Sequence, residues 1–335
     1  MSVDQITAVN ALRDGAGAFL LPREVFAVRG ADAETYLQGQ LSQDISALAV
    51  GASADSLLLQ PDGKLSALLR ITRVDAQGYV LDVDAGFGDT MVARLKKFLL
   101  RSKVEIERLD WRCLALRGAA VNEVAAGLLT VLAEGGVMAL PYEWNGWGGI
   151  DLLGPKDVVL DPTAGTLPEG IVACAADAVE ACRIVSGIPA MGSELTDKTI
   201  AAEAGLVERT VSFTKGCYTG QELVARLDAR GNNVPRRLVG VVGGTDRDGP
   251  SLAFAMTLHA ETPPPDGGDV VADKVVGTVT SAAWSPELGA WVALAYLHRT
   301  VEAPANVRIR SGDGLGGSQP ARVAPLPLTS LIPPD

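Results

Sequence analysis

Residues 215–222, Lys-Gly-Cys-Tyr-Thr-Gly-Gln-Glu, bring a thiol, an ammonium group and two glycines into one short segment. Free N–H groups at a helix start, together with the charge of Lys215, would stabilise the thiolate of Cys217 and lower its pKa. Gly216 and Gly220 let the backbone pass close to a ligand. The segment therefore predicts a reactive cysteine, whereas an arbitrary cysteine in such a turn is more often a buried structural residue.

A helix directly after the cysteine is predicted to position it. Thr219 and Glu222 have the spacing of a capping box, which predicts a helix that starts at Gly220. Gly231 is placed to end this helix in the left-handed conformation. The thiol then precedes a helix N-terminus, where an anionic ligand group is also favoured.

Few other residues could act as metal ligands or reactive groups. The chain has two histidines and four cysteines, with no C-x-x-C pair, which excludes a histidine-rich metal site and disfavours a zinc ribbon or a disulfide framework. One motif cysteine cannot supply a four-thiolate cluster site, so no tightly bound metal is expected. Cys113 and Cys182 lie in apolar patterns that are typical of buried residues.

Length and composition describe a folded, acidic protein. The 335 residues suit two or three packed units, and 47% hydrophobic with 21% charged residues is typical of globular proteins. A formal charge of −11 repels polyphosphate, so stable nucleic-acid binding is not expected. No apolar run approaches a membrane span and no secretion signal is visible, so we expect a cytoplasmic protein without membrane contact.

The chain up to residue 153 alternates between helical and strand-like patterns. Residues 56–60 and 65–73 predict a hairpin around a Pro-Asp-Gly-Lys turn, and residues 89–100 predict a helix with an apolar stripe opposite Arg94. Further helices are expected after residues 30–32 and over residues 121–129 and 175–185, and further strands over residues 24–29, 79–83, 103–107 and 112–116. This alternation predicts α+β packing, with helices on one face of a mostly antiparallel sheet.

After Gly231 the pattern changes to short β-prone runs. They cover residues 238–242, 275–281, 291–297 and 306–310, which predicts a separate small β-barrel or sandwich. We therefore expect a division into residues 1–235 and 236–335. An exposed turn is predicted at residues 263–268, and the G-x-G-x-x-G of residues 312–317 predicts a hairpin turn, because no helix follows it to bind a pyrophosphate.

The octamer at residues 215–222 resembles the signature of the YgfZ family of folate-binding, iron–sulfur-assembly proteins. Similar family motifs occur at residues 30–33, 36–42, 101–104, 187–189, 203–206, 224–226 and 230–231. Residues 277–281 and 293–296 resemble the barrel shared with the glycine-cleavage T protein, an aminomethyltransferase that uses tetrahydrofolate. The resemblance covers nearly the whole chain.

This resemblance implies a fold, a cofactor and partners. The fold would be GcvT/YgfZ-like, with two intertwined α+β folate-binding parts, one of them ferredoxin-like, around a central channel and a C-terminal β-barrel. The cofactor would be tetrahydrofolate or a one-carbon derivative. The partners would be client enzymes whose iron–sulfur clusters are assembled or repaired, tRNA-modifying enzymes among them.

The resemblance and the residue types together assign roles. Cys217 is expected to be the reactive thiol, tuned by Lys215. The expected cofactor-binding residues are Gly216, Tyr218, Gly220, Gln221, Glu222, Arg226, Arg230, Gln38, Gln40 and Arg183. Arg226 and Arg230, one turn apart, either bind an anionic group or form a solvated stripe.

Two departures from the T-protein pattern count against an aminomethyl transferase. Residues 65–68, Leu-Ser-Ala-Leu, stand where the T protein carries the acidic residue that meets the reacting folate nitrogen. Val185 replaces the Glu of an Arg-x-Glu-x-Gly motif that contacts the pterin ring, so weaker or differently posed folate binding is expected. A folate-dependent one-carbon or aminomethyl transferase and a folate-sensing binding module stay open as alternatives.

Two further groups of residues have two interpretations each. A basic cluster either lines a channel for the glutamate tail of a folate or for an RNA-linked partner, or forms a solvated surface; its members are Arg94, Lys96, Lys97, Arg101, Lys103 and Arg108. Trp144 and Trp147 either stack on a pterin or cover an edge of the core.

Overall fold

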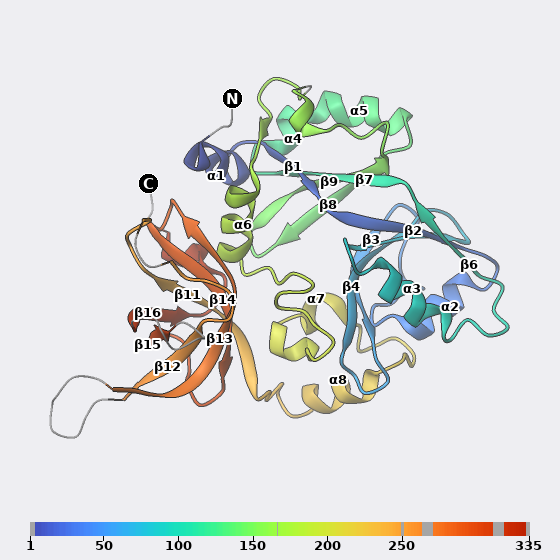
Figure 1. Ribbon diagram of the computed structural model, residues 1–335. Helices are drawn as coiled ribbons and strands as arrows, with labels where there is room; N and C mark the ends of the chain where they lie inside the picture. Colours follow the sequence, from blue (N-terminus) through green and yellow to red (C-terminus); the bar gives the residue numbers. More distant parts are fainter. Residues whose placement is uncertain (1–3, 166, 249–250, 263–270, 311–317, 333–335) are drawn as a thin grey trace.

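The computed structural model describes residues 4–165, 167–248, 251–262, 271–310 and 318–332. Three bodies are visible in Figure 1, namely two sheets with their helices and a barrel. The turn predicted at residues 263–268 and the glycines of residues 312–317 lie outside the described residues.

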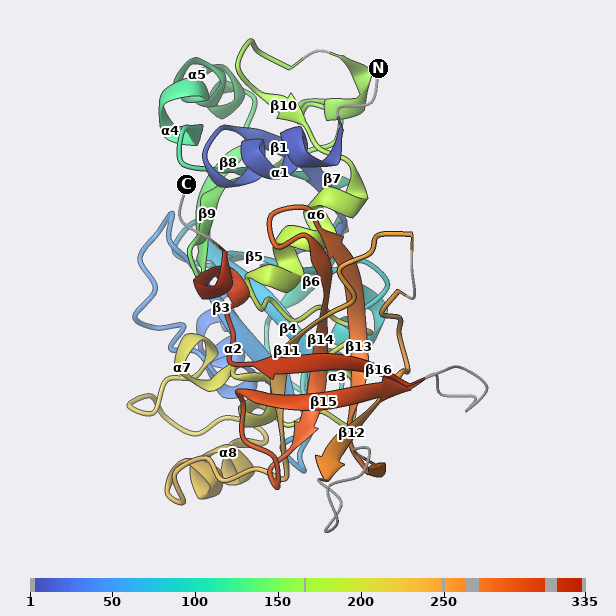
Figure 2. The same cartoon turned by 90° about the vertical axis from the view of Figure 1, so that its left-hand side faces the viewer.

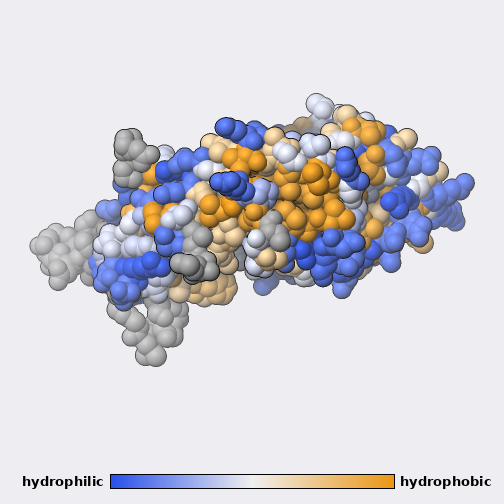
Figure 3. All heavy atoms as spheres, turned by 90° about the horizontal axis from the view of Figure 1, so that it is seen from above, coloured by the Kyte–Doolittle hydropathy of each residue, from blue (hydrophilic) through white to orange (hydrophobic). Residues whose placement is uncertain are grey.

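The first sheet has the strand order β10-β1-β7-β9-β8 and is antiparallel except where β1 pairs with β10. Its strands are β1 (Gly17–Leu21), β7 (Trp111–Arg117), β8 (Met138–Trp144), β9 (Trp147–Pro155) and β10 (Val172–Ala173). Its helices are α1 (Gln5–Arg13), α4 (Val121–Val124), α5 (Ala126–Glu134) and α6 (Ala176–Val185), and a 3₁₀ turn covers Pro162–Ala164. The single helix predicted over residues 121–129 is therefore two helices. Apolar residues gather on the upper face of the molecule (Figure 3).

The second sheet has the order β3-β4-β5-β2-β6 and is antiparallel throughout. Its strands are β2 (Arg23–Arg29), β3 (Ser53–Leu59), β4 (Leu65–Arg73), β5 (Gly78–Asp84) and β6 (Glu105–Leu109), and its helices are α2 (Ala33–Gln40) and α3 (Gly88–Lys96). Alternate residues of β4 face opposite sides, as the twofold period of a strand requires. Leu65, Ala67, Leu69 and Ile71 lie in the core, and Arg70 points to the other side.

The two α+β parts are intertwined, as predicted. The whole second sheet is inserted between β1 and β7 of the first. Later in the chain, a 3₁₀ turn (Ala201–Ala204) and helices α7 (Val207–Thr210) and α8 (Gln221–Asp228) return to the second sheet, where Val207, Tyr218 and Val224 join its core.

The C-terminal body is a closed barrel of order β11-β14-β13-β12-β15-β16. Figure 2 looks onto this barrel, with β15 and β16 crossing in front of β13 and β14. Its strands are β11 (Arg236–Gly243), β12 (Thr257–Thr262), β13 (Val271–Ser285), β14 (Ala290–His298), β15 (Ala305–Arg310) and β16 (Gln319–Ala324), followed by a 3₁₀ turn at Leu328–Leu331. Helix α6 packs on it, because Ala181, Ile184 and Val185 share a buried cluster with Val292 and Leu294. The predicted barrel is confirmed.

The predicted position of Arg94 on the exposed face of its helix is wrong. The sequence places it opposite the apolar stripe of its helix, yet it is 3% exposed and donates two hydrogen bonds to the Leu59 carbonyl. It also donates to the side chain of Gln40, and its guanidinium lies over the ring of Phe98. A long side chain with a backbone acceptor within reach can be buried on the core face of a helix.

Candidate functional site

The loop of residues 211–220 is fastened to the C-terminal end of α2. The ammonium group of Lys215 donates to the carbonyls of Gln38, Leu41 and Gln43 at 2.6, 2.6 and 2.9 Å. The Thr219 N–H donates to the Gly39 carbonyl at 3.1 Å. An ammonium group has three protons, so Lys215 uses all of them to hold the last turn of α2, its C-cap Leu41 and the segment that follows.

Burial changes the acid–base behaviour of this clamp. Desolvation lowers the pKa of Lys215 to about 8, and the nearby charge of Asp44 opposes that shift only in part. Below that pH Lys215 is cationic, and its ammonium group donates hydrogen bonds to the three carbonyls.

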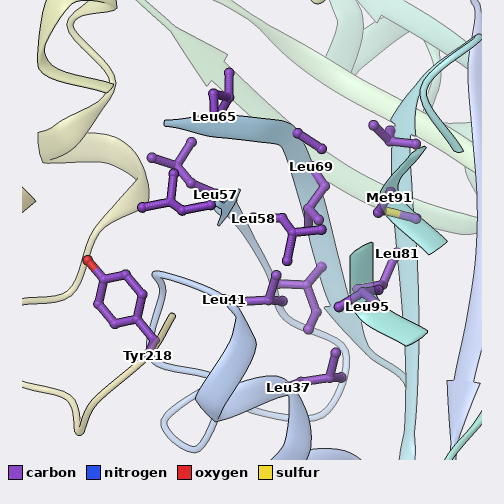
Figure 4. Packing of buried hydrophobic residues seen from close by; sticks show 14 of the residues in the cluster. Leu37, Leu41, Leu57, Leu58, Leu65, Leu69, Leu81, Met91, Leu95 and Tyr218 are labelled. Atoms are coloured by element: carbon purple, nitrogen blue, oxygen red, sulfur yellow. The ribbon is translucent and has the colours of Figure 1, made fainter. Parts of the chain in front are cut away.

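Tyr218 anchors the loop from the other side of Cys217. Tyr218 is 9% exposed and belongs to the core cluster of the second sheet, which also contains Leu41 and Leu57 (Figure 4). The Lys215 ammonium lies 5.1 Å from the centre of this ring. Cys217 is thus an exposed thiol held between two fixed neighbours, Lys215 and Tyr218.

The start of α8 differs from the predicted capping box. No side chain caps this helix; Gly220 stands at its N-cap with a φ of +84°. The Gln221 side chain instead accepts a hydrogen bond from the Tyr218 N–H at 3.1 Å. This bond closes the turn before α8 without the side chain of Thr219. Gly231 has the predicted left-handed conformation, with a φ of +67°.

The two glycines of the octamer have different reasons to be glycine. A Cβ at Gly220 would lie 2.4 Å from the Gln60 carbonyl oxygen, in the β3–β4 turn, whereas a Cβ at Gly216 meets nothing within 4 Å. Gly216 also lacks the positive φ of Gly220. Only Gly220 is required by the fold.

Alanine substitutions of the two glycines should show that the fold requires Gly220 and not Gly216. Gly220→Ala should lower the free energy of unfolding by about 2 kcal/mol, because alanine is strained at positive φ and collides with backbone. Gly216→Ala should change it by less than about 0.5 kcal/mol. Urea unfolding of both variants measures this, and equal losses would contradict the assignment.

The two predicted glutamines of α2 have structural partners. Gln38 donates to Asp44 and accepts from the N–H groups of Ile45 and Ser46. Gln40 is 9% exposed and accepts from Arg94. Glu222, Arg226 and Arg230 are exposed.

A cavity of about 620 Å³ lies between the two sheets and α6. One wall is aromatic, with Phe19, Tyr142, Trp144 and Trp147 among its residues. The rings of Phe19 and Trp147 are stacked with centroids 6.0 Å apart, and the indole N–H of Trp147 has no acceptor in the described part of the chain. We call this space the central cavity.

The polar residues of the central cavity form ion pairs across the two sheets. Asp151 of β9 binds Arg70 of β4 at 2.5 Å and Arg117 of β7 at 2.7 Å. Arg70 and Arg23 also share Asp82, and Arg23 binds Asp84. Burial disfavours ionisation of Asp151, but the two guanidiniums outweigh it and hold the pKa of the carboxyl below its ordinary value.

Arg183 is the one predicted cofactor-binding residue that lines the central cavity. Its guanidinium donates to Glu180, Glu194, Ser281 and the Ile188 carbonyl, so it joins α6 to the barrel. The other nine predicted residues and Cys217 lie on the loop, on α8 or on α2, except for Arg230, which follows the end of α8. The structure thus brings together the octamer and the glutamines of α2, and leaves Arg183 apart.

Sequence reasoning missed the carboxylates of this cavity. They are Asp55, Asp84, Asp151 and Glu180, and each is paired with an arginine. The one available signal was a charged residue inside an apolar strand, as for Asp151 between Ile150 and Leu152. At the position expected for the T-protein acid, Leu65 and Ala67 are buried in the core.

The basic cluster does not line the central cavity. Arg94 is buried, Arg108 binds Glu24 and Asp89, and Lys96, Lys97, Arg101 and Lys103 are exposed. Val185 likewise lies away from the cavity, in the cluster between α6 and the barrel.

Comparison with known proteins identifies the class of this fold. Residues 252–329 match the model of the glycine cleavage T-protein C-terminal barrel domain. The crystal structure of glycine cleavage system aminomethyltransferase T from Bartonella henselae superposes with a TM-score of 0.74, over 97% of this chain and 89% of that one, at 21% identity. The fold is that of the T protein.

Sequence relatives narrow the class. The tRNA-modifying protein YgfZ of Klebsiella pneumoniae is 30% identical over 231 residues, which cover 65% of this chain and 68% of that protein. An aminomethyltransferase of Thermus thermophilus is 28% identical over 334 residues, or 91% of this chain and 84% of the relative. The chain belongs to the YgfZ family, which is related to the glycine-cleavage T protein. No helix in the described ranges is long and apolar enough to cross a membrane.

Proposed function

We propose that this protein binds a reduced folate and supports the assembly or repair of iron–sulfur clusters in client enzymes, tRNA-modifying enzymes among them, through Cys217. The observation that carries the proposal is the presentation of one thiol. Cys217 is exposed on a loop clamped at Lys215 and Tyr218. The relatives named as tRNA-modifying proteins supply the client class.

The other three cysteines are unsuited to this role. Burial raises the pKa of the Cys113 and Cys182 thiols far above the ordinary range, and it raises that of Cys174 to about 11. A thiol with a raised pKa holds little thiolate near neutral pH, and the thiolate is the reactive form. Cys217 is therefore the thiol that a partner can reach.

The central cavity supports the folate part of the proposal. Aromatic walls favour a flat heterocycle, and about 620 Å³ falls within the size of small-molecule sites. Tetrahydrofolate would supply a one-carbon carrier at this position, held by Trp147, Tyr142 and Phe19.

Complementation tests the proposal directly. Bacteria that lack their own YgfZ-type protein should regain methylthiolated tRNA nucleosides, measured by mass spectrometry, when they express this chain. Calorimetry should show binding of tetrahydrofolate to the purified protein. A soluble chain that restores nothing, while it turns over a labelled one-carbon folate, would instead favour a transferase.

A further inference from the structure

A second cavity adjoins the central one on the side of the barrel. It measures about 800 Å³, and α7, β11 and the end of β14 contribute to its walls. Trp144 and Pro189 line both cavities, so the two spaces lie on either side of these residues. We call this second space the outer cavity.

Arg209 stands at the junction of the two cavities. It lines the outer cavity and binds Asp55, which lines the central one. Its guanidinium carbon lies 4.3 Å from the centre of the Trp144 ring. A ligand that extends from one cavity into the other therefore passes Arg209.

The arginines of the two cavities differ in their partners. Every arginine that lines the central cavity is paired with a carboxylate, and these are Arg23, Arg70, Arg117 and Arg183. In the outer cavity, Arg237 donates to the Asn232 carbonyl and Arg299 to the Asn233 side chain. Neither has a carboxylate partner among the residues that the structure describes.

Arg237 lies on β11, and Arg299 directly follows the end of the neighbouring strand β14. Arg237 of β11 is opposite Leu297 of β14, and Arg299 follows two residues beyond it. Like charges at such diagonal positions repel each other. Glu208 and Glu302 also line the outer cavity, but no ion pair joins them to the arginines in the described residues. Two neighbouring cations beside a cavity suit a ligand that carries several carboxylates.

We infer that the outer cavity binds the anionic tail of a folate, a chain of γ-linked glutamates, with Arg237 and Arg299 as the groups that bind its carboxylates. The inference rests on the proposed function, which places the ring of the folate in the central cavity. The central cavity has no unpaired arginine for such a tail, and the basic cluster lines neither cavity. The tail extends past Trp144 and Arg209.

Titration with two ligands tests this inference. Calorimetry with tetrahydrofolate monoglutamate and triglutamate should show about tenfold tighter binding of the triglutamate, since each exposed carboxylate–arginine contact contributes a several-fold gain. The gain should shrink as salt concentration rises. The double variant Arg237→Gln/Arg299→Gln should bind both ligands with the affinity that the native protein has for the monoglutamate.

A matched control removes two exposed cations elsewhere. Lys96→Gln/Lys97→Gln, which changes the charge equally outside both cavities, should keep the tenfold ratio. Equal affinity of the native protein for the two ligands would overturn this inference and leave the folate proposal standing. Absence of binding by either ligand would overturn both.

Discussion

Cys217→Ala should abolish restoration of methylthiolated tRNA nucleosides in bacteria that depend on this chain, while the protein stays folded. The side chain is exposed, so its loss should change the free energy of unfolding by less than about 0.5 kcal/mol. Tetrahydrofolate should bind the variant as it binds the native protein, because Cys217 does not line the central cavity. Nucleoside mass spectrometry, urea unfolding and calorimetry measure the three quantities.

Thr214→Ala is the matched control for the thiol. Thr214 is an exposed residue of the same loop, and its replacement should leave nucleoside levels at the native value. Equal restoration by Cys217→Ala and the native chain would remove the thiol from the mechanism and favour a folate-responsive binding module.

Asp151→Asn should cost about 3–5 kcal/mol of unfolding free energy, because it leaves the buried guanidiniums of Arg70 and Arg117 without their shared carboxylate. Asp151 is 1% exposed, so bulk water cannot solvate the two guanidiniums in place of the lost carboxylate. Asp62→Asn, at the exposed pair of Asp62 with Lys64, is the control and should change stability little.

The effect of Asp151→Asn on the free energy of unfolding should depend on pH. The pKa of Asp151 in the folded protein lies below its ordinary value of 3.8, so its ionised form stabilises the fold above that pH. This stabilisation is lost as the pH falls through the folded-state pKa. The difference in unfolding free energy between the native protein and Asp151→Asn should therefore shrink below pH about 4. A difference that stays constant from pH 7 to pH 3 would contradict the assignment.

The sequence predicted the local features of the site. The helix after Cys217 and the left-handed Gly231 depend on residues close together in the chain, and so do the β-prone runs of the barrel. Short-range patterns are set by backbone conformation and hydrophobic period, which one sequence displays.

Contacts between residues far apart in the chain could not be predicted in this way. Lys215 was expected to act on its neighbour Cys217, but its ammonium group donates to the carbonyls of Gln38, Leu41 and Gln43, at and after the end of α2. Backbone acceptors cannot be recognised from side-chain identity. Asp151 and Arg70 come from different sheets, so only the fold reveals their pairing. The predicted capping box at Thr219 is wrong because Gly220 occupies the N-cap. The Gln221 side chain closes the turn by accepting a hydrogen bond from the Tyr218 N–H.

The insertion of the second sheet between β1 and β7 sets an order of events during synthesis. Strand β1 has no neighbour in its sheet until β7 has left the ribosome, whereas β2 to β6 can pair earlier. The core of the second sheet stays open until the segment with Val207, Tyr218 and Val224 arrives to cover it. The loop that presents Cys217 is therefore fixed in place only at that late step.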